Sequence, residues 1–291
     1  MKEAIWIDVD NSPHVPLFAP LIKQYRENGI EVILTARNHS QTIELLENTG
    51  FGGTFTVIGE HYGKSRFHKV RGLLVRMKQL VAHLKRLRRE FEIKVAVSHG
   101  SRSLVLAAKW LKIPVITMYD YEFTETVIFN RFSDKVLVPE KIPDKTLDEI
   151  GLPIARRVKY QGLKEELYLN YFQPDQTFWN NFVSNNNLKI AEDTVLVALR
   201  PPATTANYHN ETSEVLFREL LQYLLGDPKT LTIISPRTDE QRVEIENLLA
   251  ELNLDRSRSV ILKKAVISYL GSRTLILTER IPYSAGIQRV Q

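Results

Sequence analysis

The sequence predicts an α/β protein in which two successive domains each contain a parallel β-sheet covered by helices. Short runs of β-branched and other apolar residues alternate with longer stretches in which apolar residues recur at helical spacing. This is the pattern of strands joined by crossover helices. It is interrupted near the middle of the chain and restarts at Thr194. A length of 291 residues fits two domains of roughly 100–200 residues each.

The first half of the chain is expected to contain six strands and four helices. The expected strands cover residues 4–9, 31–36, 54–58, 94–98, 114–119 and 135–138, and the expected helices cover residues 16–28, 41–48, 69–91 and 101–111. Gly29 is placed to end the first helix, Ser40 to cap the second, and Ser101 or Ser103 to cap the fourth. Strands separated by helices of this length lie parallel, so one sheet would be covered on both faces.

A stretch of mixed polarity over residues 143–162 carries Pro143, Gly151 and Pro153, and we interpret it as the connection between the domains. The expected organisation is an N-terminal domain over residues 1–145, a linker over 146–165 and a C-terminal domain over 166–291. Both domains are expected to be Rossmann-like and to face a cleft between them.

The C-terminal domain repeats the pattern less completely. Its expected strands cover residues 194–199, 231–235 and 260–263, and its expected helices cover residues 211–225 and 240–252. Residues 274–278 could form one more strand, but the pattern is poor after Lys264. We therefore expect this second domain to be incomplete.

The composition is that of a globular protein, with 43% hydrophobic and 25% charged residues. The absence of cysteine excludes disulfides and thiolate metal sites. No apolar run approaches the roughly 18 residues that a membrane span needs, and no signal peptide is visible at the start of the sequence. These observations favour a cytoplasmic protein.

The net charge of +5 is concentrated in one segment. Residues 64–90 contain ten Lys or Arg and one Glu, a net charge of +9, so the rest of the chain carries −4. Apolar residues recur along this segment at helical spacing, namely Val70, Leu73, Leu74, Met77, Leu80, Val81, Leu84, Leu87 and Phe91. Either this helix packs on the core and exposes a solvated basic face, or it attracts an anionic membrane surface or a phosphate-bearing acceptor. Nucleic acid is not expected, because no aromatic residues are interleaved with the cations.

Unusual polar residues follow the expected strands, at the carboxyl ends where open parallel sheets bind their ligands. In the first domain they are Asn11, Ser12 and His14, then His99, Gly100 and Ser101, then Asp120 and Glu122. In the second domain they are Arg200, Thr204, His209 and Arg237. We expect the binding and catalytic residues to come from these two groups.

His14 lies in the first strand-to-helix turn, where an imidazole could act as a general base because its pKa lies near neutrality. It could equally cap or pack against the helix. Asp8, Asp10 and Asn11 are too few for a hard-cation site, so we interpret them as residues that cap the next helix and fix the turn, and we expect no metal.

The turn His99–Ser101 offers backbone N–H groups at a helix start, which suits an anion or a sugar hydroxyl, although an ordinary helix cap would look the same. Arg200 and Arg237 end neighbouring strands, and two guanidinium groups at one sheet edge suit a diphosphate. Surface ion pairs are the alternative for these arginines. No glycine-rich phosphate loop of a known type is present.

Two segments resemble glycosyltransferase-B enzymes, notably the undecaprenyl-diphospho-muramoylpentapeptide N-acetylglucosaminyltransferases. The first is Ser12–Leu21, and the second runs from Val97 through His99-Gly100-Ser101 to Val115. A narrower resemblance is to the family called domain of unknown function 354, which is itself glycosyltransferase-B-like. It rests on Trp6-Ile7-Asp8, Asn11–Val15, Thr35-Ala36-Arg37 and Gln41-Thr42, and it covers residues 1 to 264. Non-hydrolysing UDP-N-acetylglucosamine 2-epimerases are more distantly similar.

The resemblance implies a transfer of a sugar from a nucleoside diphosphate donor to an acceptor, without a metal or a cofactor. The acceptor could be linked to a membrane. It implies that His14 activates the acceptor, that residues 99–101 and Asp120 line the acceptor side, and that Arg200 and Arg237 face the diphosphate. A 2-epimerase would instead need an acid–base pair, for which His209, Asp120 and Glu122 are candidates. A non-catalytic nucleotide-sugar binder, or an inactive truncated remnant, is the third alternative.

The sequence departs from these enzymes in three places. The first loop lacks their glycines, and Arg200-Pro201-Pro202 stands where they have a glycine-rich turn. Residues 274–291 also lack the Gly-Gly-Thr-like turn and the following helix with its ribose-binding glutamate. From this departure we expect a truncation or frameshift near Lys264. The oligomeric state is not indicated.

Overall fold

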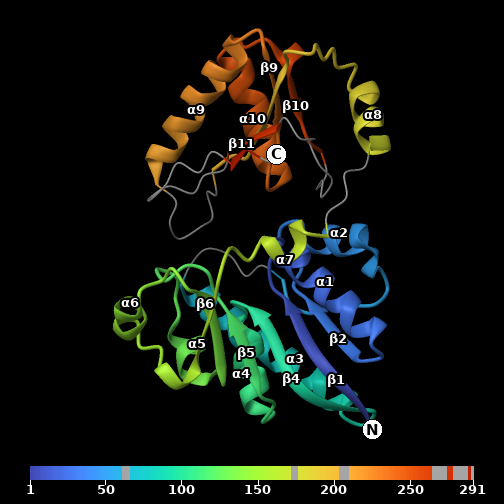
Figure 1. The fold of residues 1–291 in the computed structure, drawn as a ribbon, viewed down its shortest axis with the longest axis vertical. Helices are drawn as coiled ribbons and strands as arrows, with labels where there is room; N and C mark the ends of the chain where they lie inside the picture. The colour runs from blue at the N-terminus through green and yellow to red at the C-terminus, as the bar shows by residue number, and fades with distance from the viewer. Residues whose placement is uncertain (61–65, 172–175, 203–209, 264–273, 278–287, 290–291) are drawn as a thin grey trace. The chain divides into compact units, whose positions relative to one another are not determined.

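The computed structural model describes residues 1–60, 66–171, 176–202, 210–263, 274–277 and 288–289. The chain divides into two compact units, Met1–Phe172 and Gln173–Gln291. Each unit contains its own sheet with helices packed against it (Figure 1). The α/β class predicted for both halves of the sequence is therefore confirmed.

The first unit is built on a parallel sheet of seven strands in the order β3-β2-β1-β4-β5-β6-β7. The strands are β1 (Lys2–Val9), β2 (Glu31–Ala36), β3 (Thr56–Val57), β4 (Phe91–His99), β5 (Val115–Met118), β6 (Lys135–Pro139) and β7 (Arg157–Tyr160). The helices are α1 (His14–Glu27), α2 (Thr42–Leu46), α3 (Arg66–Leu87), α4 (Arg102–Trp110), α5 (Val127–Phe132), α6 (Asp144–Glu149) and α7 (Glu166–Leu169).

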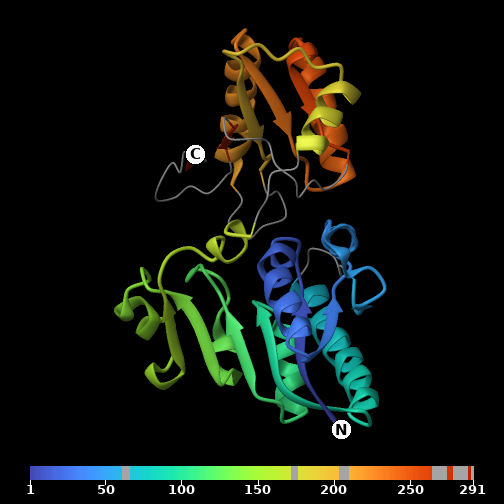
Figure 2. The same cartoon turned by 45° about the vertical axis from the view of Figure 1, so that its right-hand side comes forward.

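Helices cover both faces of this sheet because successive side chains of a strand point to opposite faces. On β1, Ala4 and Trp6 belong to the core cluster that includes residues of α3 and α4. Ile7 and Val9 belong to the other cluster, beneath α1 and α2. Figure 2 shows the strands of this sheet with α1 and α3 against them. The position of Asp8 follows from this alternation, since it shares the face of Trp6.

The second unit contains α8 (Gln176–Asn185), β8 (Val195–Leu199), α9 (Glu211–Gly226), β9 (Thr230–Ile234), α10 (Asp239–Glu251), β10 (Ser259–Ile261), β11 (Thr274–Leu277) and β12 (Gln288–Arg289). Its strands lie in the order β10-β9-β8-β11-β12. They pair in parallel, except that β12 runs antiparallel to β11. The core of this unit is formed mainly by α9, α10 and the two central strands β8 and β9.

Three sequence-based expectations are corrected. Residues 146–165 do not form a simple linker, because β7 pairs with β6 and extends the first sheet. Phe91 does not belong to the apolar stripe of the basic helix, because α3 ends at Leu87 and Phe91 begins β4. Ser40 does not cap α2, whose first turn has no side-chain cap and is preceded by Gln41.

The expected truncation near Lys264 is not confirmed. β11 lies beyond that residue and pairs in parallel with β8 from Thr274 to Leu277, so the sheet of the second unit continues past it. The strand expected at residues 274–278 is therefore present. Residues 264–273, and most of those that follow β11, lie outside the described part of the chain.

Candidate functional site

The strand order brings three of the predicted loops to one edge of the first sheet. β1, β4 and β5 are neighbours, so the segments that follow Val9, His99 and Met118 all leave the sheet at adjacent carboxyl ends. His14 and Asp120 come from the segments after β1 and β5, and His99 is the last residue of β4. The prediction that these polar residues gather at one sheet edge agrees with this topology.

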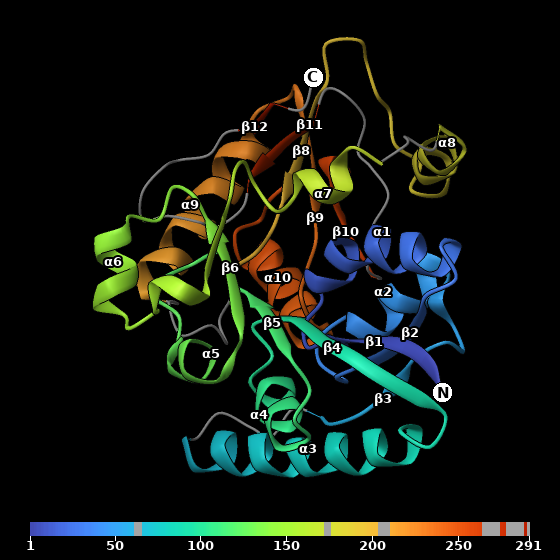
Figure 3. The same cartoon turned by 60° about the horizontal axis from the view of Figure 1, so that its bottom comes forward.

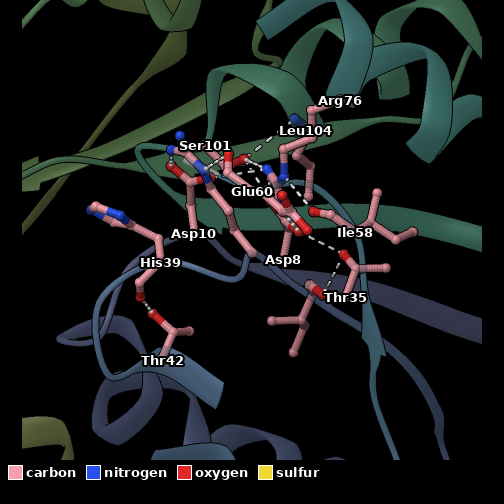
Figure 4. A network of polar contacts seen from close by, with 12 residues as sticks. Asp8, Asp10, Thr35, His39, Thr42, Ile58, Glu60, Arg76, Ser101 and Leu104 are labelled. Carbon is pink, nitrogen blue, oxygen red and sulfur yellow. Dashed lines mark hydrogen bonds and ion pairs between the residues drawn. The ribbon is translucent and has the colours of Figure 1, made fainter. Parts of the chain in front are cut away.

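A buried charge pair lies at the centre of this edge (Figure 4). Asp8 is fully buried, and Arg76 of α3 is 2% exposed. The guanidinium donates from Nη1 to Asp8 Oδ2 at 2.9 Å and from Nη2 to Asp8 Oδ1 at 2.8 Å. Thr35 and Ser101 each donate a hydroxyl to the same carboxylate at 2.6 Å. Both oxygens of Asp8 are thus occupied within the protein, which a buried carboxylate requires.

Arg76 also fixes the loops around Asp8. Its Nε donates to the carbonyl of Ile58 at 2.8 Å, and its Nη1 lies 3.0 Å from Asp10 Oδ1. Burial raises the pKa of Asp10, and the positive charges of Arg76 and Arg37 oppose that rise. We expected Asp8 and Asp10 to cap the following helix. That interpretation is wrong for Asp8, because its partner is a residue of the basic helix.

The side chain of Arg76 is accommodated by a glycine. Gly59 has a φ of +87°, and a Cβ there would lie 2.6 Å from Cδ of Arg76. An L-residue at this position would therefore be strained by its backbone conformation and would also collide with the arginine.

The start of α1 offers no backbone donors to a ligand. The first four N–H groups of a helix normally lack internal partners, but Pro13 and Pro16 have no N–H. The N–H groups of His14 and Val15 donate to the carbonyls of Asn11 and Ser12. A phosphate therefore cannot be bound here in the way that glycine-rich loops bind it.

Asn11 and Ser12 form the turn that leads into α1. Asn11 Oδ1 accepts from the N–H of Ser12 at 2.9 Å, and Ser12 Oγ accepts from the N–H of Gln41 at 3.2 Å. Ser12 Oγ also lies 3.5 Å from the hydroxyl of Thr42. These contacts tie the α1 turn to the loop before α2.

Four ionisable side chains form a cluster beside this turn. The rings of His14 and His99 lie 4.6 Å apart, and Nε2 of His99 lies 3.6 Å from Oδ1 of Asp120. Asp120 also forms an ion pair with Lys164, which is 8% exposed and precedes α7. We call His14, His99, Asp120 and Lys164 the acid–base cluster.

His14 is the member of this cluster whose protonation is most affected. Burial, followed by the positive charges of His99 and Lys164, lowers the pKa of His14 well below 6.5, while Asp120 acts in the opposite direction. Its Nδ1 is buried and has no hydrogen-bond partner among the described residues. His14 is therefore a neutral imidazole at pH 7, the form that a general base requires. Nearby, burial and the charge of Asp120 raise the pKa of Tyr160 to about 12.

In the turn after β4, more polar groups have hydrogen-bond partners within the protein than we expected. Gly100 has a φ of +65° and donates its N–H to the carbonyl of Met118. The hydroxyl of Ser101 donates to Asp8 and accepts from the N–H of Leu104, so it caps α4. Glu122 is half-buried in the segment after β5. Ser101 therefore links the start of α4 to Asp8, and its hydroxyl group is engaged within the protein.

In the second unit, Arg200 and Arg237 follow the neighbouring strands β8 and β9. Burial, followed by the positive charge of Arg237, lowers the pKa of Arg200 to about 10. Arg200 donates to the hydroxyl of Ser235 at 3.0 Å. Gln241 supports the turn, because it accepts from the N–H of Arg237 and donates to the carbonyl of Pro202. Thr204 and His209 lie outside the described residues.

Sequence reasoning missed Arg76 and Lys164. Arg76 was counted among the exposed cations, although its position four residues before Leu80 places it on the buried side of α3. Lys164 lies in the region that we interpreted as a linker. Among the residues that the structure describes, no three His, Asp or Glu side chains are grouped to hold a metal ion. None of the described helices is long and apolar enough to cross a membrane.

Two parallel-sheet units of this kind define a glycosyltransferase-B-like fold, and comparison with solved structures confirms it. The chain belongs to the family of proteins of unknown function DUF354, whose model matches residues 3–269. The uncharacterized protein MJ0665 of Methanocaldococcus jannaschii is 26% identical over 246 residues, which cover 82% of this chain and 67% of that protein.

The similar solved structures are enzymes of nucleotide sugars. The UDP-GlcNAc 2-epimerase of Neisseria meningitidis, bound to UDP-GlcNAc, has a TM-score of 0.66 at 14% identity, covering 96% of this chain and 78% of that chain. The Methanocaldococcus jannaschii UDP-GlcNAc 2-epimerase, in complex with UDP-GlcNAc and UDP, also has a TM-score of 0.66, at 18% identity, covering 96% and 79%. These similarities establish the fold that was predicted.

Proposed function

We propose that the chain binds a nucleoside diphosphate sugar and transfers the sugar to a hydroxyl group of an acceptor, with His14 as the general base. The observation that carries this proposal is the imidazole of His14, which is buried, neutral at pH 7 and unpartnered at Nδ1 among the described residues. An unpaired buried polar atom costs free energy. A catalytic role accounts for that cost.

In the proposed reaction, His14 takes the proton of the acceptor hydroxyl as its oxygen forms a bond to the anomeric carbon of the sugar. The bond between that carbon and the diphosphate oxygen breaks, and the diphosphate leaves with the electron pair. Asp120 is proposed to position His99 and to stabilise positive charge in the acid–base cluster. Asn11, Ser12, His99, Gly100 and Glu122 are proposed to line the acceptor side.

Arg200 and Arg237 are proposed to bind the diphosphate of the donor. Their mutual repulsion, which contributes to the lowered pKa of Arg200, would be relieved by an anion placed between them. Thr204 and His209 remain predicted nucleotide-binding residues. The proposal is supported by the donor-free start of α1, which leaves no backbone phosphate site at that turn.

Epimerisation of the sugar at C2 is the second candidate. The similar 2-epimerase structures support a UDP-sugar as substrate. The contact of Asp120 with both His99 and Lys164 provides a carboxylate among possible proton donors. This reaction needs an acid–base pair but no acceptor.

Incubation of the full chain with UDP-GlcNAc, followed by NMR, distinguishes the candidates. Release of UDP that depends on an added acceptor alcohol supports transfer, and the 2-epimer without an acceptor supports epimerisation. Binding without either product would overturn both. We expect His14→Gln to reduce turnover by about 10²–10⁴-fold with unchanged binding of UDP-GlcNAc. His68→Gln, an exposed histidine of α3, is the control and should leave turnover unchanged.

The donor site has its own test by calorimetry with UDP. Loss of a charge-assisted hydrogen bond costs about 1.5–3 kcal/mol, so Arg200→Gln and Arg237→Gln should each weaken UDP binding by about tenfold or more. Arg242→Gln is the matched control, because Arg242 pairs with Asp239 and Glu246 within α10. Equal affinity of all three variants would contradict the assignment.

A further inference from the structure

The outward face of α3 carries exposed residues that neither the core nor the proposed reaction uses. Figure 3 shows α3 as a long helix running along one side of the first unit. Its inward side buries Arg76, Leu80 and Leu84. Arg71, Lys78 and Lys85 are all exposed and are spaced seven residues apart, so they lie along one side of the helix.

Among the residues that the structure describes, the cations of this face have no acidic partners. Arg71, Lys78, Lys85, Arg86 and Arg89 are not within salt-bridge distance of any described Asp or Glu. Some exposed cations elsewhere are paired, such as Lys94 with Glu3 and Glu92. The face therefore presents unneutralised positive charge, which attracts an anionic partner.

Two apolar side chains lie among these cations. Val70 is 57% exposed and Leu74 is 48% exposed, and they are neighbours because they are four residues apart on the helix. Arg71 and Lys78 flank them. Single-stranded nucleic acid is bound by cations interleaved with aromatic rings, whereas apolar side chains among cations suit the boundary between lipid head groups and acyl chains.

We propose that the basic face of α3, comprising Val70, Arg71, Leu74, Lys78, Lys85 and Arg89, docks on the surface of an anionic lipid bilayer. At 1.5 Å per residue, the face from Arg71 to Lys85 extends over about 21 Å, so a flat anionic surface can meet its cations together. Val70 and Leu74 enter the head-group region while the cations contact lipid phosphates. This inference goes beyond the proposed reaction and does not depend on it.

Docking by α3 would also bring the candidate site toward the lipid. Arg76, in the middle of this helix, contacts Asp8 at the carboxyl edge of the sheet and Ser101 at the start of α4. The exposed Val70 and Leu74 therefore lie within two turns of the helical segment that is anchored to this edge. An acceptor held in a lipid surface would be close to the side of the first unit that carries the acid–base cluster.

Vesicle flotation of the full chain tests the proposal. We expect it to float with vesicles of phosphatidylcholine and phosphatidylglycerol, less so as salt is raised, and not with phosphatidylcholine alone. Because each Lys or Arg near an anionic surface contributes about fivefold in affinity, Lys78→Glu/Lys85→Glu/Arg89→Glu should reduce binding by about a hundredfold or more. Lys23→Glu/Lys145→Glu/Lys189→Glu makes the same change in net charge at exposed sites of other helices and loops and should retain binding.

A second variant separates lipid docking from simple charge attraction. Val70→Ser/Leu74→Ser keeps every cation, and we expect it to lose the part of vesicle binding that persists at high salt. Circular dichroism should show that the Lys78→Glu/Lys85→Glu/Arg89→Glu variant and the Val70→Ser/Leu74→Ser variant remain folded, since all substituted residues are exposed. Equal loss in the control variant would overturn the proposal. So would binding of single-stranded RNA without flotation on anionic vesicles.

Discussion

At the scale of single residues, the first unit depends on a charge pair between residues far apart in the sequence. Asp8 lies at the end of β1 and Arg76 lies in α3, yet both are almost fully buried and joined by two hydrogen bonds. Burial of two charges is favourable only when every lone pair and donor is satisfied. Thr35, Ser101 and the carbonyl of Ile58 complete that requirement.

Removal of one partner should therefore be costly. We expect Arg76→Met to lower the free energy of unfolding by about 3–5 kcal/mol, because it leaves the Asp8 carboxylate buried without its cation. The double variant Asp8→Asn/Arg76→Met should recover part of this loss. Chemical denaturation of the two single variants, Asp8→Asn and Arg76→Met, and of the double variant is the measurement. A loss of stability in the double variant that equals or exceeds the sum of the two single losses would contradict the pairing.

The acid–base cluster predicts a pH dependence. Because the pKa of His14 is lowered well below 6.5, the base stays neutral and turnover should decline only at pH values below 6.5. Lys164→Met removes a positive charge that lowers this pKa, so the acid limb of the pH profile should move to higher pH. Lys159→Met, whose lysine pairs with Asp144 instead, is the control and should leave the limb in place.

The same lowered pKa affects stability. Below pH 6.5 the unfolded chain binds a proton at His14 that the folded chain does not, so the free energy of unfolding falls as the pH is lowered through this range. His14→Gln should make this dependence shallower. An unchanged slope in denaturation measured at several pH values would show that other groups dominate.

The sequence predicts which residues lie at the sheet edge better than it predicts their partners. His14, His99 and Asp120 follow three strands, and strand order alone brings those ends together. The partners Arg76 and Lys164 come from a helix and from a segment between elements, and long-range pairing leaves no local periodicity in the sequence. Two signals were available: the position of Arg76 four residues before Leu80 on α3, and the alternation of Trp6 and Asp8 along β1, since a carboxylate on a core face requires a buried partner.

At the scale of elements, the start of α4 depends on a residue that both caps this helix and contacts the buried charge pair. Ser101 caps the helix by accepting from the N–H of Leu104, and it donates to Asp8. The caps of α9 and α10, Asn210 and Thr238, accept from backbone N–H groups within their own helices. The start of α4 is therefore coupled to the buried charge pair, whereas the other two caps are local.

Ser101→Ala should consequently cost more than an ordinary cap. Loss of a cap costs about 1 kcal/mol, and loss of a hydrogen bond to a buried carboxylate adds about 1.5–3 kcal/mol. Asn210→Ala should show only the first cost. Thermal or chemical unfolding of each variant measures the difference, and equal losses would indicate that the bond to Asp8 adds nothing.

Most elements could be predicted because their apolar spacing is regular over several turns or residues. The strands that became β8, β9 and β11 were placed within one or two residues of their observed bounds. β7 was missed because its four residues, Arg157–Tyr160, carry two cations and little buried surface. A strand at the edge of a sheet lacks the apolar run that marks a central one.

At the scale of the whole molecule, each unit has its own sheet and its own core. The first unit has a core cluster on each face of its sheet, and the second has a separate cluster. No residue is shared between the first two clusters and the third. Each unit thus buries enough apolar surface to be a folding unit in its own right.

We expect residues 1–172 to fold when expressed alone and to unfold cooperatively on heating. UDP should raise the melting temperature of the full chain through the second unit but leave that of residues 1–172 unchanged, because Arg200 and Arg237 belong to the other unit. Circular dichroism with and without UDP is the measurement. A UDP-dependent shift in the isolated first unit would place the nucleotide site there.

The close approach of Arg76 to Gly59 has a consequence for the evolution of the family. A Cβ at residue 59 would collide with the arginine, and Arg76 in turn neutralises Asp8. Loss of the arginine would remove this collision and would also leave Asp8 without its cation, but the positive φ of Gly59 would still favour glycine. Homologous sequences that replace the arginine should therefore also replace the carboxylate, so these two columns of a family alignment should covary while position 59 stays glycine.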